Sequence, residues 1–162
     1  MVTLKEMTAA MEPALLGQVV DFWHVHGAEC SPDEVLQNIR DWQGEGHALY
    51  AIMDAEQPVG FLHLGSRGAG RDWIEEIYVQ PERRGKGLAS EAIRLVEGMI
   101  REGGSDAAYI EVAANNAEAI GLYHKLGYDR LALVVLRKDF VPVEDVGEVV
   151  AHGKAFKVAK GN

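Results

Sequence analysis

Residues 77–89 read IYVQPERRGKGLA, and this stretch decides how the chain is interpreted. Its apolar start is typical of a strand, and the run that begins at Leu88 is typical of a helix. Between them, Gly85 and Gly87 allow the main chain to approach a ligand closely. The first amides of a helix have no partner within it and lie at its positive dipole end. The stretch therefore predicts a turn that binds phosphate.

Two well-known nucleotide-binding loops do not fit this stretch. A Walker A loop needs four residues between its first glycine and a Gly-Lys-Ser/Thr sequence, and the spacing here is shorter. The dinucleotide-binding pattern Gly-x-Gly-x-x-Gly is not matched, because the third glycine would fall at position 90, which is serine. A plain strand-to-helix turn with solvated arginines would also explain the two glycines. The residues around this stretch are therefore needed to distinguish such a turn from a phosphate-binding one.

Hydrophobic periodicity predicts an alternation of strands and helices around the turn. An extended start at residues 2–5 precedes two helices, at residues 9–23 and 32–42, and Ser31 with Glu34 indicates a capping box at the second. The remaining elements expected are a hairpin of strands at 47–53 and 59–64, a strand at 72–80, a helix at 88–101, a strand at 107–113, a helix at 117–126 and a strand at 131–137. Beyond residue 139 the pattern fits a hairpin that turns at His152-Gly153, or an appended helix.

Composition and charge narrow the class of protein. The 162 residues suit one domain, and the net charge of −9 disfavours nucleic acid while favouring cationic ligands. Cys30 is the one cysteine, which excludes an internal disulfide framework and a zinc site of several thiolates. No secretory signal and no apolar run long enough to span a membrane are visible, so we expect a cytoplasmic protein that does not bind membranes.

The stretch at residues 84–89, RGKGLA, resembles the loop with which the GNAT family of N-acetyltransferases holds the pyrophosphate of coenzyme A. A second stretch, NNAEAIGLYHKLGY at residues 115–128, resembles the family's other signature, with Asn116 seven residues before Tyr123. The resemblance implies an α/β fold, with a mixed and mostly antiparallel sheet of six to seven strands flanked by about four helices. It implies one N-acetyltransferase domain at residues 1–140, and we expect residues 141–162 to pack on it or to lie at the interface of a homodimer.

The same resemblance implies acetyl-CoA as the cosubstrate and no metal. In the family, the strand before the loop holds the pantetheine arm and the thioester carbonyl through its main chain, which assigns Ile77 and Val79 to those contacts. The full set of residues expected to contact acetyl-CoA is Ile77, Tyr78, Val79, Arg84, Gly85, Lys86, Gly87, Leu88, Ala89, Ser90, Asn116 and Tyr123.

Acyl transfer needs an acid for the departing thiolate and a base for the amine. A phenol can protonate a thiolate, and the family uses a tyrosine as its general acid at the position of Tyr123. Glu75 and Glu76 are the candidates for the base, directly or through a water. Because successive strand residues point to opposite faces, we expect one of the two to face the acceptor. Residues 74–79, IEEIYV, resemble the polyamine and thialysine branch of the family, where the first acidic position is the proposed base, and this resemblance favours Glu75.

The acceptor is expected to be a primary amine, with a small cationic amine of the polyamine or amino-acid kind preferred. Candidate acceptor residues lie near the turn between the first two helices, which borders the acceptor pocket in the family: Trp23, His24, His26 and Glu29. Acetylation of a peptide or protein, and a non-catalytic module that binds acyl-CoA, are the alternatives.

Overall fold

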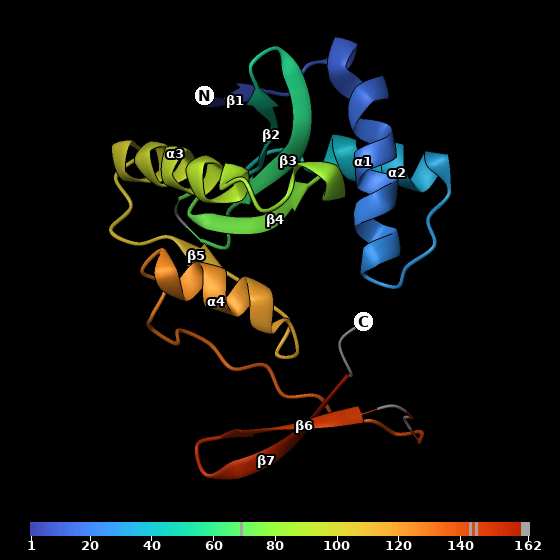
Figure 1. Cartoon of the computed structure of the whole chain (residues 1–162), viewed down its shortest axis with the longest axis vertical. Helices are drawn as coiled ribbons and strands as arrows, with labels where there is room; N and C mark the ends of the chain where they lie inside the picture. The colour runs from blue at the N-terminus through green and yellow to red at the C-terminus, as the bar shows by residue number, and fades with distance from the viewer. Residues whose placement is uncertain (69, 143, 145, 160–162) are drawn as a thin grey trace. The chain divides into compact units, whose positions relative to one another are not determined.

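The computed structural model describes residues 1–68, 70–142, 144 and 146–159. The chain divides into two compact units, Met1–Ile110 and Glu111–Asn162, and each is described here by itself. Figure 1 shows the helices and strands with their labels. The first unit contains the strands β1 (Val2–Glu6), β2 (Ala48–Asp54), β3 (Gln57–Gly65), β4 (Trp73–Val79) and β5 (Tyr109–Ile110), the helices α1 (Glu12–Val25), α2 (Pro32–Asp41) and α3 (Leu88–Glu102), and the short 3-10 turns Ala9–Met11 and Pro81–Arg83.

The strands of the first unit form one mixed sheet in the order β1-β2-β3-β4-β5. The first four are antiparallel to their neighbours, and β5 runs parallel to β4. The hairpin of β2 and β3 confirms the expected pair of strands. The sheet is thus mostly antiparallel, as expected, and it has five strands in place of the six or seven predicted.

One face of the sheet is covered by α1 and α2, which pack on it through aromatic side chains. The ring of Phe22 in α1 lies 5.5 Å from that of Phe61 in β3 and 6.4 Å from that of Tyr78 in β4. Such rings bury large apolar areas and give the core a fixed geometry. The core on this face consists of Met7, Leu15, Val19, Phe22, Val35, Ile39, Trp42, Leu49, Ala51, Met53, Phe61 and Tyr78.

The helix α2 begins with the capping box expected from the sequence. The Glu34 amide donates to Ser31 Oγ at 3.3 Å, and the Ser31 amide donates to Glu34 Oε2 at 2.7 Å. These bonds satisfy main-chain donors that the first turn would leave open. The cap fixes where α2 starts, and so the length of the turn between α1 and α2.

The opposite face of the sheet is covered by α3 (Figure 1). Its buried side chains recur at helical spacing, as the sequence predicted for this segment. They are Leu88, Ala92, Ile93, Val96 and Ile100. The sheet therefore lies between two helical layers, and the turn before α3 is held at the end of β4.

The second unit contains α4 (Ala117–Lys125) and a two-stranded sheet of β6 (Val146–Ala151) and β7 (Lys154–Ala159). The hairpin turns at His152-Gly153, both with positive φ, so this alternative for the end of the chain is the one observed. The predicted strand at 131–137 is wrong: these residues have no regular structure, and Leu131 and Val135 are 79% and 84% exposed. Their β propensity indicates an extended chain, but a strand also needs a neighbour to pair with. The domain boundary expected at residue 140 stays a prediction.

The predicted strand at 107–113 is much shorter than expected, because only Tyr109 and Ile110 pair with β4. No helix among the described residues has the length and apolar character needed to cross a membrane.

Candidate active site

The turn after β4 has the geometry expected of a phosphate-binding loop. Gly85 and Gly87 have φ angles of +72° and +79°, which other residues rarely adopt. A β-carbon at either position would meet no atom within 4 Å, so the space beside the loop is open. Gly87 is the N-cap of α3 and no side chain caps the helix, which leaves the first amides of α3 available to an anion. Lys86, Leu88, Ala89 and Ser90 complete this loop and first turn.

The side chains of the basic residues near the loop partly fold back onto the protein. Arg84 Nε donates to the carbonyl oxygen of Val79 at 2.9 Å. Arg83 donates to Gln57 Oε1 at 2.7 Å and lies 3.7 Å from Asp54. Lys86 Nζ donates to the carbonyl oxygen of Glu82 at 3.4 Å. In this arrangement the groups that the loop presents to an anion are its main-chain amides more than these basic side chains.

The end of β4 has one edge that β5 does not cover. Pairing between β4 and β5 stops at Ile74, whereas pairing between β3 and β4 continues to Val79. The Gln80 amide donates to Val59 in β3, and ladder bonds alternate along an antiparallel strand, so the main-chain groups of Ile77 and Val79 point away from β3. These are the two residues that the sequence assigned to main-chain contacts.

A β-bulge in β4 changes the expected orientation of the two glutamates. Glu76 pairs with His63 and Ile74 pairs with Leu64, so Glu75 is an extra residue in the strand. Glu76 contacts His63 on the face covered by α1 and α2, and the Glu75 side chain covers Gly65 on that same face, where a β-carbon would lie 2.7 Å from its Cγ. The bulge therefore interrupts the alternation on which that expectation rested, and which of the two glutamates faces the acceptor stays a prediction.

Glu75 is held by an arginine through both oxygens. Arg67 Nε lies 3.1 Å from Oε1, and Arg67 Nη2 lies 2.5 Å from Oε2. The guanidinium also lies over the ring of Trp73, 4.0 Å from its centroid. This arrangement is the bidentate, stacked geometry that arginine favours.

Glu76 is the end of a row of polar side chains that the sequence did not reveal. Its Oε2 is hydrogen-bonded to Nδ1 of His63, and Nε2 of His63 lies 2.9 Å from Nδ1 of His47. His63 is 3% exposed, and its ring stacks on that of Trp42 at 5.1 Å. The available signal was a histidine within β3, whose other buried residues are apolar or glycine.

The side chain of Tyr78 belongs to the core. Its ring stacks on Phe61 at 5.7 Å, and the residue is 4% exposed. Burial, and after it the negative charge of Asp21, raises the pKa of its hydroxyl. The side chain of Tyr78 is thus in the core and its main-chain amide faces β3, so neither is directed at the open edge of β4, and the contact with acetyl-CoA expected of Tyr78 stays a prediction.

In the second unit, Asn116 is the N-cap of α4 and its Oδ1 accepts from the amide of Ala119 at 3.1 Å. Asn116 thus caps the helix α4. Tyr123 lies in the last turn of α4, with its ring 6.2 Å from that of Tyr128. Burial raises the pKa of the Tyr123 hydroxyl.

The acceptor candidates at the turn between α1 and α2 fall into two kinds. Trp23 and His26 have bonds that support the fold: Trp23 Nε1 donates to Asn38 at 2.9 Å, and His26 Nδ1 lies 2.7 Å from the carbonyl oxygen of Phe22. His24 and Glu29 form an exposed pair, 3.1 Å apart. His26 is exposed as well, whereas Trp23 is partly buried.

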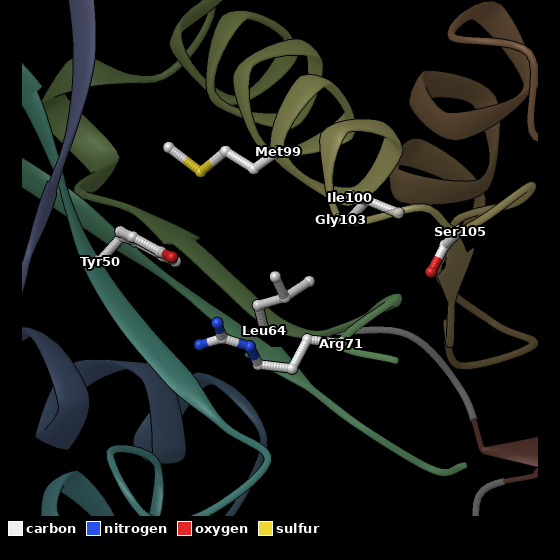
Figure 2. Close-up of a pocket in the computed structure, with 7 residues that line it drawn as sticks. All are labelled: Tyr50, Leu64, Arg71, Met99, Ile100, Gly103 and Ser105. Carbon is white, nitrogen blue, oxygen red and sulfur yellow. The ribbon is translucent and has the colours of Figure 1, made fainter. Parts of the chain in front are cut away.

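Figure 2 shows a cavity under the carboxyl-terminal end of α3, with Tyr50, Arg71 and Met99 around it. Its volume is about 190 Å³. From Leu88 to Ile100, which also lines the cavity, α3 rises about 18 Å. The cavity is therefore separate from the glycine loop at the other end of the helix.

Comparison with known proteins agrees with this geometry. The family model described as "Acetyltransferase (GNAT) family" matches residues 15–128. The chain belongs to the GNAT family. Membership confirms the resemblance drawn from the two signatures, and it places the chain among acyltransferases of the N-acetyltransferase kind.

Two curated relatives match this GNAT chain over very different shares of their own length. The peptidyl-lysine N-acetyltransferase YjaB of Salmonella typhimurium is 24% identical over 71% of this chain and 72% of its own length. The uncharacterized protein ML0378 of Mycobacterium leprae is 34% identical over 46% of this chain, and the match spans only 20% of that protein.

Solved structures share the GNAT fold with this chain. The structure of AAC(6')-Iy in complex with the bisubstrate analog CoA-S-monomethyl-acetylneamine is 17% identical, with a TM-score of 0.70. The similarity covers 87% of this chain and 99% of that one. At this identity the comparison concerns the fold, and the expected α/β GNAT fold is confirmed.

Proposed function

We propose that this GNAT chain transfers an acetyl group from acetyl-CoA to a primary amine while both are bound. The single observation that carries the proposal is the open edge of β4, which leads directly into the loop of Gly85 and Gly87. One segment thereby offers main-chain amides to a thioester and, a few residues later, amides at a helix end to phosphates.

The residues of the loop suit the phosphates of the cosubstrate. Two glycines with positive φ lead into a helix whose first amides no side chain caps, and the space beside the two glycines is open. Arg84 and Lys86 add positive charge next to those amides. Acetyl-CoA supplies the activated acyl group, and the residues of this chain bind the cosubstrate and orient that group.

The chemistry assigned to this chain's residues is direct transfer. The amides of Ile77 and Val79 stabilise the negative charge that develops on the thioester oxygen. A carboxylate of β4 takes the proton of the amine, and Tyr123 protonates the departing thiolate. For Tyr123, the support is its place in the signature and the raised pKa of its hydroxyl, which keeps the proton on the phenol.

We propose a small cationic amine as the acceptor, because the chain carries a net charge of −9 and both glutamates of β4 lie on the face covered by α1 and α2. A lysine side chain in a peptide is the second candidate, since the relative YjaB is named a peptidyl-lysine N-acetyltransferase. Cytoplasmic location and a homodimer remain predictions.

A thiol-release assay with acetyl-CoA tests the proposal over a panel of polyamines, amino acids, aminoglycosides and lysine peptides. Release of coenzyme A that depends on a small amine supports it, and release with lysine peptides alone supports the second candidate. Binding of acetyl-CoA by calorimetry without transfer to any amine would indicate a non-catalytic module instead. Undetectable binding at millimolar acetyl-CoA would overturn the proposal.

A further inference from the structure

We propose that Glu76 is the base of this transfer and that His63 and His47 are positioning residues that orient its carboxylate. The inference rests on the proposed function, and it adds two residues that the sequence signatures do not contain. It follows from the different surroundings of the two glutamates of β4.

Glu75 is poorly suited to accept a proton. Both of its oxygens are bound by the guanidinium of Arg67, which itself is fixed over Trp73. A bidentate bond of this kind uses a lone pair on each oxygen and holds the carboxylate against the guanidinium, so an amine would have to compete with Arg67 for it. Its side chain is 15% exposed, against 21% for that of Glu76.

Glu76 has a different arrangement, because a histidine binds one of its oxygens. His63 contacts Oε2, which leaves Oε1 for a substrate. Glu76 also directly precedes Ile77, the first of the two residues whose amides face the open edge of β4. The carboxylate is thus fixed on one side and adjacent to the proposed thioester contacts.

The bonds along the row determine where the ring protons lie. An ionised carboxylate can only accept, so Nδ1 of His63 carries the proton toward Glu76. In the neutral ring Nε2 then accepts, so Nδ1 of His47 donates to it across 2.9 Å. The row therefore runs from His47 through His63 to Glu76 with every donor directed at the carboxylate.

The row is held by rigid elements. His63 and Glu76 are direct partners in the ladder of β3 and β4, and His47 precedes the first residue of β2. The ring of Trp42 stacks on that of His63, with 21° between their planes. Locked rotamers of this kind are what a catalytic carboxylate needs to keep its direction.

In the reaction step, the N–H bond of the ammonium breaks and its proton moves to Oε1 of Glu76. The freed lone pair attacks the thioester carbon, and as the C–S bond breaks the thiolate takes a proton from the Tyr123 hydroxyl. The nitrogen of the new amide loses its second proton to solvent, from which the Tyr123 phenolate regains one, and Glu76 releases its proton to solvent. Other charged groups near the row are Arg71, which donates to the carbonyl oxygen of His47 at 3.5 Å, and Glu6, which lines a cavity of about 110 Å³ beside His47.

Steady-state kinetics on the full chain, with an amine that the wild type acetylates, test the inference. We expect Glu76→Gln to lower kcat about 100-fold or more and Glu75→Gln to lower it far less. His63→Leu should lower kcat about 10-fold or more and leave KM for acetyl-CoA within about 3-fold. His63→Asn keeps a donor near the position of Nδ1 and should recover much of the loss. His152→Asn, at an exposed turn, is the matched control.

Imidazole nitrogen shifts in the NMR spectrum of the wild type give a readout that needs no activity and no mutant. We expect the proton on Nδ1 in both His63 and His47 at neutral pH. A proton on Nε2 of His63 would overturn the row, as would wild-type kcat in a folded His63→Leu variant. An inactive wild type would instead contradict the proposed function, so the two failures are distinguishable.

Discussion

A β-carbon added to Gly60 would lie 2.1 Å from the main-chain carbonyl oxygen of Tyr78 in the neighbouring strand. Only a glycine in β3 therefore allows β4 to lie where the structure has it. This contact lies within the part of β4 that β5 does not cover, just before the loop. The position of the candidate site thus depends on the absence of a side chain at Gly60 in the neighbouring strand.

We expect Gly60→Ala to destabilise the fold by about 1–3 kcal/mol, because the strands must separate to admit the methyl group. The affinity for acetyl-CoA should fall with it, since β4 moves. Chemical denaturation measures the first effect and calorimetry the second. Gly17→Ala is the control: its β-carbon meets nothing within 4 Å, and a helical alanine should stabilise α1. An unchanged free energy of unfolding in Gly60→Ala would contradict this account.

Gly87→Asp should abolish binding of acetyl-CoA without unfolding the chain. It places a negative charge at the amino terminus of α3 and a side chain at a φ of +79°. Calorimetry measures the affinity and circular dichroism the fold. Gly98→Asp, on the same helix with open space around its β-carbon, should retain binding. Wild-type affinity in Gly87→Asp would mean that the loop does not hold the phosphates.

Ser31→Ala should cost about 1 kcal/mol of stability through loss of the helix cap of α2. The bonds from Ser31 lower the pKa of Glu34, so their contribution is present above the ordinary pKa of a glutamate and is lost as the pH falls through the lowered value. The difference between wild type and variant should therefore shrink in acid. Denaturation curves at neutral pH and at about pH 3 measure it, and a difference that grows in acid would refute the assignment.

Tyr123→Phe should lower kcat about 100-fold and change the affinity for acetyl-CoA much less. Burial raises the pKa of the Tyr123 hydroxyl, so the donating form is lost only when the pH rises through this raised value, above the ordinary pKa near 10. Wild-type kcat should thus show no alkaline decline from this group between pH 6 and 9. Tyr128→Phe is the comparison for packing damage, and full kcat in Tyr123→Phe with rate-limiting chemistry would remove the acid role.

The sequence predicted the elements whose signals are local. The capping box of α2, the glycines of the loop and the apolar stripe of α3 each depend on residues a few positions apart, and the structure has all three. The choice between a hairpin and a helix after residue 139 was harder, because the pattern of apolar residues there fits both. His152-Gly153 can turn a hairpin, yet such a pair can also end other structures.

The sequence could not predict features that depend on pairing between distant residues. The bulge at Glu75 is a property of the register between β3 and β4, and it alone places Glu75 on the same face as Glu76. The contact between His63 and Glu76 joins residues 13 positions apart, and no local pattern indicates it. Residues 131–137 have the composition of a strand, but composition does not provide the partner that a strand requires.

The open edge of β4 gives neighbouring amides of one strand different access to solvent. The amides of Glu76 and Tyr78 face β3 and are protected by its carbonyl groups, whereas those of Ile77 and Val79 face the side on which, within the described part of the first unit, β5 pairs only with Trp73 and Ile74. Deuterium should therefore replace hydrogen quickly at 77 and 79 and slowly at 76 and 78, a period of two within a single strand. A ligand that accepts from this edge would slow the two fast positions and leave the other two unchanged.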